Sequence, residues 1–164
     1  MSKELHDLLD QLIHQAKAEE LDHINELFHG LLNQESDSRN VGFIGKLLQM
    51  NRKINGQTCE MSIPLNPLVN NSLGIVHGGV TATLIDSAMG TLANSLLPEG
   101  FGAVTTQLNI HYIAPGIGES LRCTAQCEHK GSKTMVLTAT VYRTDGMKVA
   151  TASGSFFIIN KSSN

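Results

Sequence analysis

A histidine, two glycines and one aspartate lie close together in the middle of this chain, at spacings that suit catalysis. His77, Gly78 and Gly79 come directly before a long apolar segment, and Asp86 follows Gly78 by eight residues. Backbone N–H groups at the start of a helix can stabilise a developing negative charge, and a carboxylate can act as a base or a nucleophile. An unpaired charge in apolar surroundings is strongly unfavourable. Asp86 is therefore a candidate catalytic residue.

Residues 80–97 are predicted to form the helix that positions these groups. Apolar residues recur at every fourth position: Val80, Leu84, Ala88, Leu92 and Leu96. A second apolar set fills a neighbouring face, so most of the circumference is apolar and the helix is predicted to be wrapped by other structure. Its polar residues argue against a membrane span, and the Pro-Glu-Gly sequence at 98–100 ends it.

The spacing of Gly78 and Asp86 limits how they can act together. Eight residues of helix correspond to about 12 Å. A reacting carbonyl needs its hydrogen-bond donor and its base each within about 3 Å. One copy of the helix cannot place both groups on one carbonyl, but two antiparallel copies across a two-fold axis could. If both groups are catalytic, the site is shared between subunits.

The segments on both sides of the helix are predicted to be strands. Residues 43–50 and 58–65 flank Asn55-Gly56, a strong hairpin signal. Four further strands are predicted in a meander, at residues 103–113, 119–129, 133–143 and 148–159. We expect an α+β fold in which an antiparallel sheet curls around the central helix. Such a sheet leaves an edge strand and an open face, so self-association to a dimer or tetramer is expected.

The N-terminal segment is predicted to be a separate helical extension. Residues 2–34 have apolar residues at helical spacing with charged residues between them, as one helix or two with a break near 17–20. A polar linker follows at 33–40, so we divide the chain into an extension at 1–38 and a main domain at 39–164. Four histidines occur in the extension, but none are four residues apart, and no metal site is predicted.

The central residues closely resemble a known family. Asn71, His77-Gly78-Gly79 and Asp86, at these spacings, are similar to the hotdog-fold acyl-CoA thioesterases of the phenylacetate-degradation (PaaI-like) and THEM2-like branch. The resemblance continues through residues 104–116 and 130–134 and covers roughly residues 41–159. It implies a hotdog fold and hydrolysis of an acyl-CoA, or an acyl-carrier thioester, to the free acid and thiol. It implies no metal and no cofactor, because coenzyme A is part of the substrate.

The resemblance also implies a role for each residue of the motif. Asp86 would attack the thioester carbonyl or deprotonate the attacking water. The backbone N–H of Gly78, or less favourably of Gly79, would bind the carbonyl oxygen. His77 would support the start of the helix. The alternatives are a carboxylate that only binds a backbone turn, glycines that only form a turn, and a histidine that only packs or caps.

Five other residues are assigned on the same basis. Asn71 would position the water or substrate, and Thr105 rather than its neighbour Thr106 would hold the water. Lys130, Ser132 and Lys133 flank a turn that in relatives lies near the phosphate end of coenzyme A, where cations would meet phosphates. Asn71 could instead be a turn residue, and the lysines could belong to a solvated hairpin.

Composition narrows the classes of function. The chain has 164 residues and a formal charge of −3, with scattered lysines and arginines and no tryptophan, so we predict no nucleic-acid partner. We recognise no signal peptide and no apolar run of membrane length, and Cys59, Cys123 and Cys127 form no CxxC pair. We therefore expect a cytoplasmic protein with reduced thiols and no membrane partner.

Two alternatives to a thioesterase stay open, and several are disfavoured. A hotdog domain could bind acyl-CoA without turnover, as a regulatory module, although such a module would not need Asp86. An esterase acting on oxygen esters would have the same site residues. The chain has no Gly-x-Ser-x-Gly motif and no nucleotide-binding glycine motif, and no histidine shortly follows Asp86 as hotdog hydratases require.

Overall fold

The structure is a computed structural model that describes residues 2–32 and 42–161. The chain divides into two units, Met1–Gln49 and Met50–Asn164, and each is described here by itself. The predicted linker at 33–40 lies outside the described residues. No helix in the part of the chain that the structure describes is long and apolar enough to cross a membrane.

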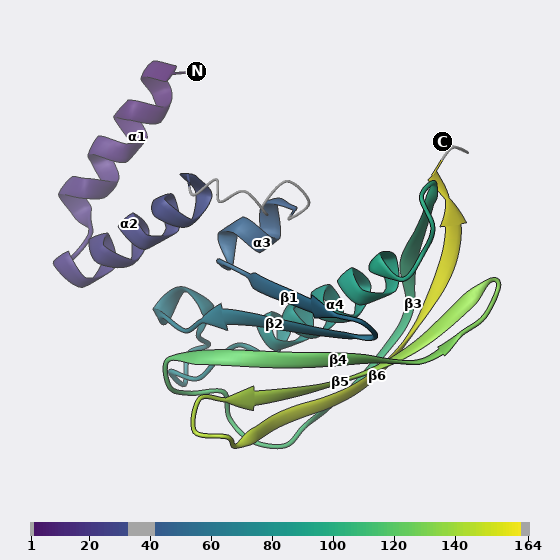
Figure 1. Cartoon of the computed structure of the whole chain (residues 1–164). Coiled ribbons are helices and arrows are strands. Elements are labelled where there is room, and N and C mark those ends of the chain that lie inside the picture. The colour runs from purple at the N-terminus through teal and green to yellow at the C-terminus, as the bar shows by residue number, and fades with distance from the viewer. Residues whose placement is uncertain (1, 33–41, 162–164) are drawn as a thin grey trace. The chain divides into compact units, whose positions relative to one another are not determined.

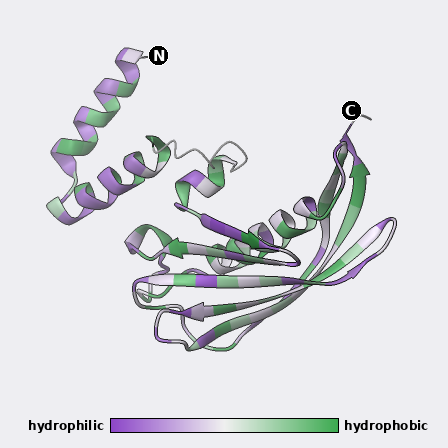
Figure 2. Ribbon diagram, in the orientation of Figure 1, coloured by the Kyte–Doolittle hydropathy of each residue, from purple (hydrophilic) through white to green (hydrophobic). Residues whose placement is uncertain are grey.

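The first unit contains three helices: α1 (Ser2–Gln15), α2 (Ala18–Leu32) and α3 (Phe43–Leu47). The break between α1 and α2 lies at residues 16–17, at the edge of the interval predicted. Both helices alternate between hydrophilic and hydrophobic positions (Figure 2), and neither buries a residue completely. α3 contacts α2.

The strand predicted at residues 43–50 is wrong, because α3 occupies most of it. The apolar residues come in adjacent pairs, Phe43-Ile44 and Leu47-Leu48, which is helical rather than alternating spacing. After α3 the side-chain amide of Gln49 donates a hydrogen bond to the Glu26 carbonyl oxygen of α2 at 3.3 Å. The first strand therefore begins only at Asn51.

The second unit is one antiparallel sheet and one long helix (Figure 1). The strands are β1 (Asn51–Asn55), β2 (Thr58–Pro64), β3 (Phe101–Tyr112), β4 (Ser120–Lys130), β5 (Thr134–Arg143) and β6 (Lys148–Asn160), and the helix is α4 (Gly78–Ser95). The predicted hairpin at Asn55-Gly56 is confirmed: Asn55 pairs with Thr58, and Gly56 has φ of +58°, which favours glycine.

The order of strands in the sheet differs from the predicted four-stranded meander. It is β1-β2-β4-β5-β6-β3, so β3 pairs with β6 and not with β4, and only β4, β5 and β6 form a meander. The reason is α4, which follows β2 in the chain and contacts β2, β3, β4, β5 and β6. The helix carries the chain across the sheet, and β3 forms at the far edge.

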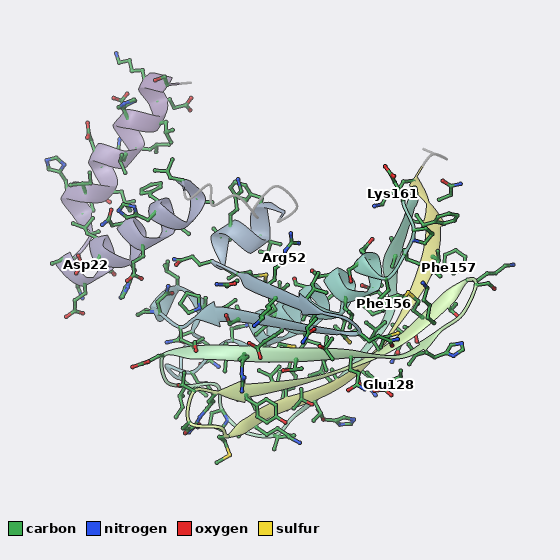
Figure 3. The ribbon with its side chains drawn as sticks, viewed as in Figure 1. Asp22, Arg52, Glu128, Phe156, Phe157 and Lys161 are labelled. Carbon is green, nitrogen blue, oxygen red and sulfur yellow. The ribbon has the colours of Figure 1, made fainter. Side chains whose placement is uncertain are left out.

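The core lies between one face of the sheet and α4. Four strands, β2, β4, β5 and β6, bury alternate residues. They include Met61 and Ile63 of β2, Leu121 and Cys123 of β4, Met135 and Leu137 of β5, and Phe156 of β6. Figure 3 labels Phe156 and Phe157, which are consecutive in β6; Phe156 is 0% exposed and Phe157 is 42% exposed. This is the alternation expected of a half-buried sheet.

α4 is buried on one face rather than all round. The buried residues are Thr81, Leu84, Ile85, Ala88, Met89, Leu92 and Ala93. Asp86 lies on the remaining face and is half-buried. The prediction that other structure wraps most of this helix is therefore not met within a single chain, because the sheet covers only one side of α4.

Candidate active site

The start of α4 is held by the loop that leads into it. Pro67–Val69 forms a short 3-10 helix, and the His77 N–H donates to the Val69 carbonyl oxygen at 2.9 Å. The Val76 N–H donates to the Gly116 carbonyl oxygen, also at 2.9 Å. These bonds fix the direction in which the chain enters the helix.

His77 is the N-cap of α4. Its Nδ1 accepts a hydrogen bond from the Gly79 N–H at 2.9 Å. Since Nδ1 is an acceptor, the neutral ring carries its proton on Nε2. His77 thus satisfies one of the N–H groups that a helix start leaves without an intrahelical partner.

The two glycines differ in the state of their N–H groups. The Gly79 N–H is taken by His77. The Gly78 N–H has no hydrogen-bond partner among the described residues. Of the two donors considered from the sequence, only Gly78 is free to bind a ligand in this structure.

The two glycines also differ in whether the fold requires them. A Cβ at Gly79 would lie 3.0 Å from His77 Nδ1, so the cap leaves little room for a side chain. A Cβ at Gly78 would lie 3.5 Å from the ring of Tyr112, an ordinary van der Waals contact, and no positive φ is found at that position. In the described part of this chain, space and backbone conformation permit a small side chain at 78.

Gly78 lines an open cavity of about 360 Å³. Asn71, Thr81 and Tyr112 are polar members of its wall. The apolar members include Ile75, Val76, Ile113, Pro115 and Val149. A mostly apolar wall with a few polar groups is typical of a small-molecule site.

Asn71 is held in a turn at the edge of this cavity. Its Oδ1 accepts from the Leu73 N–H at 2.9 Å, and its own N–H donates to the Ile75 carbonyl oxygen at 2.8 Å. Asn70 instead forms an isolated β-bridge with Val76. Asn71 is therefore a turn residue that also lines the cavity, and its role in positioning the water or substrate stays a prediction.

Asp86 and Thr105 form a second polar group, which does not line the cavity. The Thr105 hydroxyl donates to Asp86 Oδ1 at 2.8 Å. Thr106 points elsewhere, and its hydroxyl donates to the Ser155 carbonyl oxygen at 3.0 Å. The two hydroxyls thus have different partners, and the role of Thr105 in holding the water stays a prediction. The pairing of β3 with β6 shifts register between Thr105 and Gln107, a β-bulge beside Asp86.

The lysine-containing turn lies at the opposite end of α4 from Gly78. Lys130 donates a hydrogen bond to the Leu96 carbonyl oxygen at the C-terminus of the helix. Ser132 and Lys133 are exposed in the β4–β5 hairpin. Since α4 has 18 residues, this end is about 27 Å from Gly78 at 1.5 Å per residue. The ammonium group of Lys130 is already engaged with the helix.

The structure adds Tyr112 to the residues predicted from the sequence. Tyr112 ends β3, lines the cavity, and donates from its hydroxyl to the Gly78 carbonyl oxygen at 2.8 Å. No residue spacing in the sequence indicates this contact, because its acceptor is a backbone atom 34 residues away.

Three ionisable groups outside the site, Cys59, Cys123 and Asp145, have pKa values shifted by their surroundings. Burial raises the pKa of the Cys59 thiol to about 11 and that of Cys123 to about 12, so neither forms a thiolate near neutral pH. The Arg143 hydrogen bond lowers the pKa of Asp145, in an exposed turn. Among the described residues, no group of three or more His, Cys, Asp or Glu side chains could hold a metal ion.

Comparison with known proteins identifies the class that this fold and site define. Residues 73–150 match the model of the thioesterase superfamily. The chain belongs to this superfamily, and its sheet packed on α4 is the hotdog fold of these thioesterases.

Individual relatives agree with this assignment. A Bacillus halodurans protein whose crystal structure was determined with CoA is 40% identical, with a TM-score of 0.84, and the match covers 93% of this chain and 99% of that one. Mouse acyl-coenzyme A thioesterase 13 is 39% identical over 74 residues, which are 44% of this chain; the match spans only about half (51%) of the mouse protein's length. A Haemophilus influenzae thioesterase has a TM-score of 0.71 at 16% identity, covering 74% of this chain and 85% of that one, which shows the shared fold alone.

Proposed function

We propose that this protein is an acyl-CoA thioesterase that hydrolyses the thioester to a free acid and CoA. The observation that carries the proposal is the unpaired Gly78 N–H at the N-terminus of α4, beside a largely apolar cavity. A helix N-terminus with a free N–H suits the oxyanion that develops on a thioester carbonyl. The CoA bound to the Bacillus halodurans protein and the name of the mouse relative support the same substrate class.

The proposed site is formed by two copies of the chain. Gly78 and Asp86 are about 12 Å apart along one helix, too far to meet at one carbonyl. β3 is an edge strand of 12 residues, and Thr105, Thr106 and Gln107 are exposed in a single chain. A long edge strand with free backbone groups favours pairing with another copy. Such pairing would bring Gly78 of one copy to Asp86 of the other.

The chemistry follows from these positions. The carbonyl oxygen accepts from the Gly78 N–H, and the apolar cavity next to it receives part of the acyl-CoA. Asp86, held by Thr105, either deprotonates a water that adds to the carbonyl carbon or attacks that carbon itself. Collapse of the tetrahedral intermediate breaks the C–S bond and releases the CoA thiolate. In the general-base route the free acid forms directly, and the proton taken from water passes from Asp86 to the thiolate. In the nucleophilic route the acyl group stays on Asp86 as a mixed anhydride, which a water then hydrolyses to the free acid and the regenerated carboxylate. His77 supports the Gly78 donor by capping the helix, and Asn71, in the cavity wall, would position the water or substrate.

Coenzyme A would extend from this site toward a cationic surface. Lys133 and Ser132 are exposed in the β4–β5 hairpin and can approach phosphates. Lys130 is bound to the helix C-terminus, so we assign it a smaller part in binding.

The test is release of free thiol from phenylacetyl-, hydroxybenzoyl-, acetyl-, hexanoyl- and lauroyl-CoA. The Asp86→Ala variant is expected to lower kcat at least about 100-fold, the effect of losing a base or nucleophile. Asp86→Asn keeps an acceptor for Thr105 and removes only the charge, so it should be equally inactive. Glu99→Ala, which removes an exposed acid beyond the end of α4, is the matched control and should keep full activity.

Two outcomes would contradict the proposal in different ways. Full activity of Asp86→Ala would eliminate the mechanism while leaving a thioesterase. No turnover of any acyl-CoA by the wild-type protein, together with tight binding, would favour the regulatory binding module instead.

A further inference from the structure

The peptide group between Gly78 and Gly79 is held at both of its polar atoms. Its carbonyl oxygen accepts from the Tyr112 hydroxyl at 2.8 Å. Its N–H donates to His77 Nδ1 at 2.9 Å. Glycine has more backbone freedom than any other residue, so two consecutive glycines at a helix start would otherwise be loosely oriented. The two ring side chains restrict that freedom by binding the two opposite polar atoms of one peptide group.

The contact of Tyr112 involves more than its hydroxyl. The ring and hydroxyl lie 3.5 Å from the position that a Cβ on Gly78 would occupy, so Tyr112 packs directly beside the glycine. Tyr112 is nevertheless 54% exposed. Burial of the ring therefore does not by itself account for its position, and the hydrogen bond to Gly78 is the contact that distinguishes tyrosine from phenylalanine there.

We propose that Tyr112 is a positioning residue that orients the free Gly78 N–H toward the substrate carbonyl. This inference rests on the proposed function, because it assigns a role within the same oxyanion site. A backbone N–H stabilises an oxyanion only when it points at the oxygen, so a small misorientation of the Gly78 N–H lowers the rate of hydrolysis even though the donor is still present. Tyr112 fixes the peptide group that follows the donor, and His77 fixes the same group from its other side.

β3 aligns both reacting groups of the site. Near its middle, at the bulge, Thr105 holds the carboxylate of Asp86; at its end, Tyr112 holds the backbone of Gly78. The same strand is the free edge of the sheet. Both positioning contacts are already made within one chain, so pairing of β3 with a second copy would bring two pre-oriented groups together in the shared site.

The test is the Tyr112→Phe variant, which removes the hydroxyl and keeps the ring. We expect kcat to fall about 10-fold, less than the loss of a whole oxyanion donor, with KM changed by less than about two-fold. The melting temperature should stay the same, because the ring still packs on Gly78. The chain has two tyrosines. Tyr142→Phe, in β5 and outside the site, is the matched control and should leave both kcat and KM unchanged.

A spectroscopic measurement separates positioning from a general structural effect. The infrared carbonyl stretch of a 13C-labelled hexanoyl-CoA is recorded when bound to Asp86→Ala, and again when bound to Asp86→Ala with Tyr112→Phe. A weaker hydrogen bond from Gly78 should reduce the shift of this band toward low frequency in the double variant. This readout does not depend on turnover.

The results of these two experiments distinguish a wrong role for Tyr112 from a wrong proposed function. An unchanged kcat and band position in the Tyr112→Phe proteins would overturn the role of Tyr112 while the thioesterase remained. A fall in kcat matched by a fall in melting temperature, with the band unmoved, would overturn it too, in favour of a structural role. No thiol release by the wild-type protein would instead contradict the proposed function.

Discussion

The two halves of α4 treat their hydrogen-bonding groups in opposite ways. At the C-terminal end, the Ser95 hydroxyl donates to the Leu92 carbonyl oxygen at 2.8 Å, and Lys130 donates to the Leu96 carbonyl oxygen. At the N-terminal end, His77 binds the Gly79 N–H, but the Gly78 N–H stays without a partner among the described residues. One end is closed by side chains and the other is left partly open.

The C-terminal half of α4 also forms hydrogen bonds with the sheet, through Asn94. Asn94 uses both polar atoms of its side chain: Oδ1 accepts from the Ala103 N–H at 3.1 Å, and Nδ2 donates to the Gly90 carbonyl oxygen at 2.8 Å and to the Ala103 carbonyl oxygen at 3.4 Å. The side chain of Asn94 thus binds both backbone polar groups of Ala103, as a residue on a neighbouring strand would. It anchors the start of the strand that carries Thr105 and Tyr112.

This difference separates a structural end from a reactive end. Helix termini normally find partners for their free backbone groups, so an N–H left open beside a cavity is informative. The carboxylate of Asp86 lies midway, on the half-buried face that the sheet does not cover. If this distinction is right, the N-terminal half of α4 should form a site together with a second copy of the chain. Gly78 should be needed for activity and not for stability, and the C-terminal half of α4 should affect stability only.

The largest expected effect is recovery of activity when two inactive variants are mixed. Asp86→Ala lacks the carboxylate, and Gly78→Val fills the space beside the donor with a branched side chain. If each site combines Gly78 of one copy with Asp86 of the other, a mixed dimer contains one intact site. Co-expression in equal amounts should then restore about a quarter of wild-type thiol release, since about half of the dimers are mixed.

Controls for this experiment use the same two proteins. Each variant alone should be folded by circular dichroism and inactive in thiol release. If both groups acted within one chain, every site in a mixed dimer would carry one of the two substitutions. Activity no greater than the sum of the separate variants would therefore show that the site is not shared.

A tenfold effect is expected from adding one methyl group to the open end. Gly78→Ala should lower kcat/KM about 10-fold, because the new methyl group would lie 3.5 Å from Tyr112 in the wall of the cavity, beside the proposed oxyanion donor. The variant should be at least as stable as the wild type, because the Cβ has room and alanine favours helix. Thermal unfolding and thiol release, measured on the same preparation, give the two readouts.

Gly90→Ala is the matched control in the second half of α4. A Cβ at Gly90 would lie 3.7 Å from the ring of Phe156, an ordinary contact. The free energy of unfolding should rise by about 0.5–1 kcal/mol with no change in activity. Equal activity of the Gly78 and Gly90 variants would remove the distinction between the two ends.

Local patterns in the sequence predicted the parts of the site that depend on one element. The apolar repeat predicted a helix at 80–97, which the structure places at 78–95, and the Asn55-Gly56 turn was correct. The alternation of strand side chains placed Thr105 and Thr106 on opposite faces, and their hydroxyls do bind different partners, Asp86 and the Ser155 carbonyl oxygen. These predictions rest on helical and strand periodicity, which can be read from the residue types along the chain.

Features that depend on pairing between distant segments were not predictable. The position of β3 beside β6 depends on α4 crossing the sheet, and no local signal in residues 101–112 indicates the partner strand. Tyr112 was missed because its partner is the backbone of Gly78. The short helix α3 was mistaken for a strand because the hairpin signal at Asn55-Gly56 was given more weight than the helical spacing of its apolar pairs.

The smallest expected effects distinguish two lysines at the closed end of α4. Lys130→Met should lower the free energy of unfolding by about 0.5–1 kcal/mol, because it removes a cation from the helix C-terminus, and should leave KM nearly unchanged. Lys133→Met should leave stability unchanged and raise KM for acyl-CoA a few-fold, an effect that weakens at high salt as expected of an exposed contact with phosphate. Melting temperature and KM at low and high ionic strength provide the comparison. An equal rise of KM in both variants would show that Lys130 leaves the helix to bind coenzyme A, so that the closed end takes part in binding as well.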